Sequence, residues 1–163
     1  ENPERKRKEA LVNSKTGKRT EAYRAYEELI YCGYQHIQMV LNDLRILYME
    51  DDNHEMAKKL VEVSSSAAST FEMGKYNEVC FGLDVAAWER DVVWTAQLMQ
   101  EILDSVGTIG DFTKSELYQH MTIKSVDSNF LVGLKQELLK SLRDETFNYM
   151  QGNEDWEKLK SVL

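Results

Sequence analysis

The segment GKRTEAYRAYEEL, residues 17–29, carries the pattern from which the fold class can be predicted. Its first residue, Gly17, is typical of a position that ends a helix. Small and apolar residues then recur at intervals of three and four, namely Ala22, Tyr26 and Leu29. Because these intervals place side chains on one helical face, the segment predicts a turn followed by an amphipathic helix. With a preceding helix around Ala10, it makes a helical hairpin.

Similar arrangements of small and apolar residues recur twice further along the chain. In the second copy they are Leu44, Tyr48, Ala57 and Val61, and in the third they are Leu83, Ala86, Ala87, Thr95, Met99 and Ile102. The spacing resembles the tetratricopeptide repeat, with Thr95 where a small alanine is expected. Paired helices of this kind cannot bury their apolar faces singly, so they stack and build a binding surface. The resemblance implies a right-handed superhelix of stacked antiparallel hairpins.

The composition also predicts an all-helical domain. The chain has 163 residues, of which 42% are hydrophobic, with a single proline and eight glycines. A strand-rich fold needs more turn residues than this. We therefore predict an all-α fold in one domain, in which residues 1–106 form the hairpins. Residues 107–163 add an irregular segment and C-terminal capping helices to the same domain.

Glycines and capping residues predict where the helices begin and end. The expected breaks are Gly17, Gly33, the turn at residues 51–53, the segment 71–76, the turn at Arg90 and Asp91, and Gly107. Thr20 is expected to cap the second helix and Asn153 the last one, which holds Trp156, Leu159 and Leu163. Before it, a long amphipathic helix is predicted from Phe130, Leu134, Leu138 and Leu142.

Charge is segregated along the chain. Residues 1–19 contain seven Lys or Arg against three Glu, which gives +4 and leaves −12 for the remainder of a chain whose net charge is −8. An acidic body repels phosphate backbones, so the chain by itself is not expected to bind DNA. No apolar stretch of membrane length and no signal peptide is apparent, and two cysteines are too few for a disulfide scaffold. These features predict a cytoplasmic protein.

No pattern of residues indicates catalysis or a bound metal. The three histidines lie far apart, and Glu116 with His120 on one helix face is interpreted as surface polar pairing. Residues 51–55 begin like a calcium loop but lack its glycine and its distant glutamate. Since a phosphate-binding glycine loop and an activated nucleophile are also missing, we expect no enzyme activity, no cofactor and no metal.

Four sets of short phrases extend the resemblance beyond the repeat. They are Gly17-Lys18 with Glu21-Ala22-Tyr23 and Tyr26-Glu27-Glu28-Leu29; Phe71-Glu72-Met73-Gly74-Lys75-Tyr76; Ser115-Glu116-Leu117-Tyr118 with His120-Met121; and Leu142-Arg143-Asp144-Glu145 with Phe147, Tyr149-Met150 and Trp156. They are similar to the carboxy-terminal helical domain of Xre-type helix-turn-helix transcriptional regulators of Gram-positive, clostridia-like bacteria. The resemblance implies a sensor and dimerisation domain that forms a homodimer, senses a ligand, or does both. The ligand would be a peptide, a small molecule or a protein partner, and the homodimer would form either through the hairpins or through the long final helix. DNA would be contacted only through an amino-terminal domain that is not part of this chain.

Related regulators bind short signalling peptides in the concave face of their repeats, which the inward helix of each hairpin lines. The polar residues on those helices are therefore the predicted ligand contacts, namely Asn42, Arg45, Asn77 and Asp84. Two alternatives stay open. One is a free-standing adaptor whose helical groove holds a segment of another protein. The other is a redox sensor that uses Cys32 and Cys80, although cysteines on apolar helices are usually small core residues.

Overall fold

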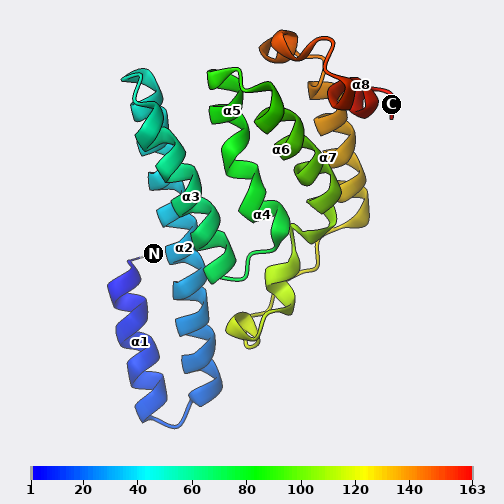
Figure 1. The fold of residues 1–163 in the computed structure, drawn as a ribbon. Coiled ribbons are helices and arrows are strands. Elements are labelled where there is room, and N and C mark those ends of the chain that lie inside the picture. The colour runs from blue at the N-terminus through cyan, green and yellow to red at the C-terminus, as the bar shows by residue number, and fades with distance from the viewer. Residues whose placement is uncertain (1, 163) are drawn as a thin grey trace.

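The computed structural model describes residues 2–162, which form helices and the turns between them (Figure 1). The α-helices are α1 (Pro3–Lys15), α2 (Arg19–Glu50), α3 (His54–Thr70), α4 (Lys75–Val79), α5 (Leu83–Glu89), α6 (Val92–Ser105), α7 (Ser128–Ser141) and α8 (Glu154–Lys160). Short 3-10 turns lie between them: η1 (Cys80–Gly82), η2 (Val106–Thr108), η3 (Asp111–Lys114), η4 (Glu116–Tyr118) and η5 (Glu145–Met150). The all-helical prediction is confirmed. None of the helices in residues 2–162 combines the length and apolar character needed to cross a membrane.

The helices stand side by side in a row that follows their order in the chain (Figure 1). Helix α1 packs against the N-terminal half of α2, and α3 packs against its C-terminal half. Next in the row come α4 with α5, then α6 and α7, while α8 lies at the upper end of α7. Neighbouring helices run in opposite directions, which is the arrangement of successive helical hairpins.

Helix α2 corrects the prediction that Gly33 ends a helix. Residues 19–50 form one continuous helix of 32 residues with Gly33 near its middle. A glycine inside a helix costs only about 1 kcal/mol relative to alanine, because it adds backbone entropy to the unfolded chain. Packing against α1 and α3 stabilises the two halves and outweighs that cost. The first two predicted hairpins therefore share one helix.

Most other predicted boundaries are confirmed. The side chains of Asn53, Asp91 and Asn153 each accept a hydrogen bond from the backbone N–H three residues later, which starts α3, α6 and α8. Thr20, by contrast, does not cap α2, because Lys18 holds the capping position without a side-chain hydrogen bond. Between the predicted breaks at residues 71–76 and at Arg90, the chain does not form one helix, because η1 separates α4 from α5.

Two clusters of buried side chains are prominent in the core. The first joins α2 and α3 to the segment between α6 and α7, and it contains Tyr34, Ala68, Met73 and Tyr118. The second joins α6 and α7 to the C-terminal end, and it contains Ala96, Met99, Leu103, Leu139, Leu142, Met150, Trp156 and Leu159. The irregular segment after α6 therefore does not only cover an end of the row: it folds back against α2 and α3.

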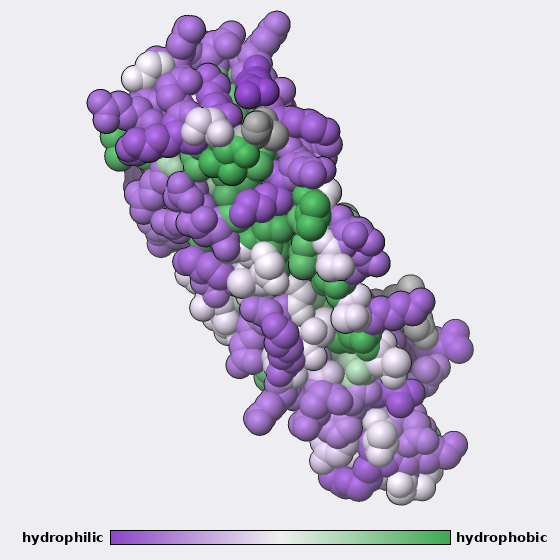
Figure 2. Space-filling model, turned by 90° about the vertical axis from the view of Figure 1, so that its right-hand side faces the viewer, coloured by the Kyte–Doolittle hydropathy of each residue, from purple (hydrophilic) through white to green (hydrophobic). Residues whose placement is uncertain are grey.

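The predicted apolar face of α7 is only partly buried. Leu142 directly after the helix is in the core, whereas Phe130 in its first turn is 55% exposed, since only the C-terminal part of α7 carries core residues. On the side of the molecule that carries α7, hydrophobic residues form a patch in the upper half, and the lower end is largely hydrophilic (Figure 2). Of the apolar residues predicted for the last helix, Trp156 and Leu159 are buried, and Leu163 lies outside the described residues.

Candidate functional site

Three of the four predicted ligand contacts come together between α2 and α5. The Arg45 guanidinium donates hydrogen bonds from Nη2 to Asn42 Oδ1 (2.8 Å) and to Asp84 Oδ2 (2.7 Å). Its Nη1 donates to the carbonyl oxygen of Phe81 at 2.9 Å. We call this set of contacts the Arg45 node. It ties the C-terminal half of α2 to η1 and α5.

The Arg45 node has little capacity left for a ligand. The Arg45 side chain is 5% exposed, and its Nη atoms already serve protein acceptors. The Nε atom is buried without a partner, which is an unfavourable position for a charged donor. Of the two charged groups in the node, only the Asp84 carboxylate, 46% exposed, can be reached from solvent. The geometry therefore indicates a structural clamp, and ligand contact by these residues stays a prediction.

Removal of the Asp84 carboxylate should test this clamp. Asp84→Ala leaves a buried guanidinium without its anion, so we expect a loss of about 2–3 kcal/mol in the free energy of unfolding. Glu137→Ala is the matched control, because Glu137 pairs with Lys140 at 2.6 Å while both side chains are well over half exposed. That loss should stay below about 0.5 kcal/mol. Urea unfolding of both variants measures the difference, and equal losses would contradict the clamp.

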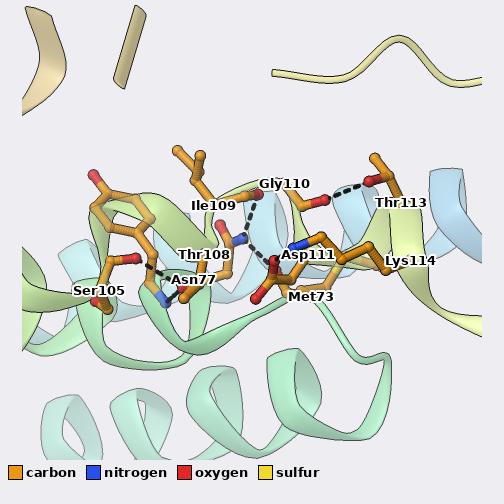
Figure 3. A network of polar contacts seen from close by, with 10 residues as sticks. Met73, Asn77, Ser105, Thr108, Ile109, Gly110, Asp111, Thr113 and Lys114 are labelled. Atoms are coloured by element: carbon orange, nitrogen blue, oxygen red, sulfur yellow. Dashed lines mark hydrogen bonds and ion pairs between the residues drawn. The ribbon is translucent and has the colours of Figure 1, made fainter. Parts of the chain in front are cut away.

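Asn77, the fourth predicted contact, belongs to a separate network (Figure 3). Its Nδ2 donates to the carbonyl oxygens of Met73 (2.6 Å) and Ile109 (3.2 Å). Beside it, the backbone N–H of Tyr76 donates to Thr108 Oγ1 at 2.8 Å. These bonds fasten the turn before α4 to the segment after α6. Asn77 thus has a positioning role, and sequence spacing could not separate it from the other three residues.

The two cysteines lie in different environments. Cys80 is largely buried next to the Arg45 node, and burial raises the pKa of its thiol to about 11 even though the charge of Arg45 acts in the opposite direction. Cys32 is exposed, which corrects the expectation that both cysteines lie in apolar surroundings: only one face of α2 packs against the core. Both thiols are free, so the structure holds no disulfide between them.

Alkylation should distinguish the two thiols. A thiol with a pKa of about 11 has roughly one hundredth of the thiolate of an ordinary cysteine at pH 8, and the thiolate is the nucleophile. Iodoacetamide should therefore modify Cys32 first and Cys80 at least about 100-fold more slowly, with the Cys80 rate still rising with pH above pH 9. Peptide mass spectrometry over time measures both rates. Equal rates in the folded protein would contradict the burial of Cys80.

Two of the three histidines, His54 and His120, are structural in this geometry. His120 does not pair with Glu116, as the sequence suggested, but with Glu27 on α2. The Glu27 carboxylate contacts His120 Nδ1 at 2.5 Å and accepts from its backbone N–H at 2.8 Å. His54 stacks on Trp88 and lies 3.0 Å from the Glu89 carboxylate. Within residues 2–162, no group of His, Cys, Asp and Glu side chains is placed to hold a metal ion.

A groove between α6 and α8, which the sequence did not predict, is the better candidate for ligand binding. It has a volume of about 420 Å³ and is lined by Val93, Ala96, Gln97, Gln100, Glu101, Asn153, Asp155, Lys158 and Leu159. We call it the α6–α8 groove. Buried Ala96 and Leu159 give it an apolar floor, and amide and charged side chains surround them. Its size is within the range of sites for small ligands. A larger hollow, of about 510 Å³, is lined by residues of α1 and its cap alone and is not a cleft between elements.

The α6–α8 groove could not be found from the sequence, since its two sides come from distant parts of the chain. Gln97 and Gln100 recur at helical spacing on α6, but only the fold brings Asp155 and Lys158 opposite them. The Nε2 atoms of both glutamines donate within α6, to Glu101 and Asp104 respectively. Their amide oxygens make no hydrogen bond among the described residues and are available as acceptors.

No protein-family model matches the chain, and no curated protein and no solved structure shows significant similarity to it.

Proposed function

We propose that the chain is the sensor and dimerisation domain of a bacterial DNA-binding transcriptional regulator, and that it binds a short peptide in the α6–α8 groove. In this proposal the row of hairpins winds as a right-handed tetratricopeptide-like superhelix. The domain acts in the cytoplasm as a homodimer, without enzyme activity. The observation that carries the proposal is the groove itself, because it lies where the row of hairpins meets the C-terminal helix.

The lining of the α6–α8 groove suits an extended peptide. Glutamine amides bind backbone N–H and C=O groups of any sequence, and the apolar floor accepts a small side chain. The charged groups in the lining are Glu101, Asp155 and Lys158, which leaves a net negative charge. A peptide with a basic side chain is therefore favoured over an acidic one.

The groove also offers a route from binding to regulation. Its two sides belong to α6 and to α8, so a ligand that contacts both favours one placement of α8 on the row over another. Regulation is then a shift between populations of two arrangements, and its size equals the difference in ligand affinity for them. The acidic body of the chain cannot supply the DNA contact, which the proposal assigns to a separate amino-terminal domain.

The proposal is tested on the gene that encodes the chain. The codons upstream of Glu1 should specify a helix-turn-helix of about 60–70 residues. The complete gene product should then shift promoter DNA in a gel, and Gln100→Ala with Asp155→Ala should leave that DNA binding intact while it abolishes the response to peptide. An upstream segment of another kind would overturn the proposal and favour a free-standing adaptor.

A further inference from the structure

A row of apolar side chains on α2 is exposed to solvent. It consists of Ile30, Gly33, Ile37, Val40, Leu44 and Leu47, and we call it the α2 stripe. The exposed fractions of its five large residues lie between 37% and 51%. A contiguous row of this kind on one helix is unfavourable in water and typically marks an interaction surface.

The spacing of the α2 stripe is that of a coiled-coil seam. Its residues follow one another at intervals of three, four, three, four and three. This period of 3.5 residues keeps a stripe facing a second helix along its whole length, whereas the straight helix period is 3.6. The stripe therefore fits a helix better than it fits an extended peptide or a flat surface.

The order of these intervals also identifies the occupant. They are the same in both chain directions, so the stripe is complementary to itself when two copies lie antiparallel about a two-fold axis. In that register Ile30 lies opposite the partner's Leu47, and Ile37 opposite the partner's Val40. Gly33 lies opposite the partner's Leu44, so the smallest residue of the stripe packs against a large one. Apart from the two adjacent residues and the surrounding backbone of α2, no heavy atom lies within 4 Å of the position of a Gly33 Cβ, which leaves that space open.

Polar pairing supports the antiparallel orientation. His36 and Asp43 lie along the same edge of the stripe, and neither makes a hydrogen bond or an ion pair within residues 2–162. An antiparallel pair places His36 of each copy next to the partner's Asp43, so two such contacts form. A parallel pair would place the same residues beside the partner's Leu41 and Tyr48, so His36 and Asp43 would have no hydrogen-bonding contact with each other.

We propose that two copies of this chain dimerise through the α2 stripe, with their α2 helices antiparallel and the two-fold axis between Ile37 and Val40. This inference rests on the proposed function, because it identifies the interface of the dimer proposed there. The stripe lies on α2, so the dimer joins the two copies at the end of the row opposite the α6–α8 groove (Figure 1).

Sedimentation velocity over a range of concentrations tests the interface. The chain should sediment as a dimer, and Val40→Glu should raise the dimer Kd at least about 30-fold, because it puts a charge beside the two-fold axis. Val132→Glu is the matched control: Val132 is 58% exposed on α7, and its replacement should leave the Kd unchanged. Circular dichroism of both variants should show the helical content of the parent chain.

Cysteine pairing tests the orientation. In a Cys32→Ser background, chains with Ile30→Cys are mixed with differently tagged chains carrying Leu47→Cys, and the mixture is oxidised. The antiparallel dimer should give the mixed disulfide between positions 30 and 47. Disulfides between two Ile30→Cys chains would overturn the orientation. A monomer at every concentration, or a dimer unaffected by Val40→Glu, would overturn the interface, and neither result alters the test of the upstream DNA-reading segment.

Discussion

Gly74→Ala should destabilise the protein by roughly 3–5 kcal/mol, since two separate costs coincide at this position. Gly74 precedes α4 with φ +90° and ψ 155°, a backbone region that is essentially restricted to glycine. A Cβ there would lie 2.1 Å from the carbonyl oxygen of Thr108, so the turn and the segment after α6 would have to separate. That movement also disturbs the hydrogen bonds of Asn77 (Figure 3). Chemical unfolding monitored by circular dichroism gives the loss.

Gly17→Ala is the control for the backbone cost alone. Gly17 has φ +84°, but nothing lies within 4 Å of the position of its Cβ. We expect a loss of about 1 kcal/mol there, which is the usual cost of alanine at positive φ. An equal loss in the free energy of unfolding for the two variants would contradict the close approach of Gly74 to Thr108.

Trp156→Ala should cost about 3–5 kcal/mol and release the C-terminal end from the row. Trp156 is 1% exposed, contacts the tilted ring of Phe147 with ring centroids 5.0 Å apart, and donates from Nε1 to the carbonyl oxygen of Leu142 at 3.3 Å. Its removal leaves a cavity in the cluster that joins α6, α7 and α8. Hydrogen exchange should accelerate in α7 and α8 while α1–α3 keep their protection.

Trp88→Ala is the control for Trp156→Ala, because it makes the same substitution at a half-buried site. Trp88 stacks on His54 near the surface, with ring centroids 4.1 Å apart, so we expect a loss of about 1–2 kcal/mol. Faster exchange in α1–α3 after Trp156→Ala would show that the two core clusters unfold together and would contradict a separate C-terminal unit.

Much of the fold could be predicted from local signals. Asn53 and Asn153 cap the helices that follow them, and Gly74 occupies a turn that only glycine fits. Such signals act within a few residues, so the sequence alone reveals them. Gly33 shows the limit, because whether one glycine ends a helix depends on what packs on either side of it. That information lies in α1 and α3 rather than in the segment itself.

The candidate site was less accessible to prediction for the same reason. The structure does bring together Asn42, Arg45 and Asp84. The sequence could not show that the Arg45 guanidinium would already be hydrogen-bonded to acceptors within the protein. The α6–α8 groove depends on where a short C-terminal helix packs, which no local spacing encodes. The partner of His120 was missed because Glu27 is distant in the chain.

The continuity of α2 determines how a small tilt is transmitted along the molecule. A helix of 32 residues is about 48 Å long, so a tilt of about 5° at one end displaces the other by about 4 Å. A hinge at Gly33 would absorb such a tilt between the two halves. Because the helix has no hinge there, α2 moves as one rigid rod. When α3 shifts the C-terminal end of α2, the N-terminal end, which carries the α1–α2 turn, moves farthest.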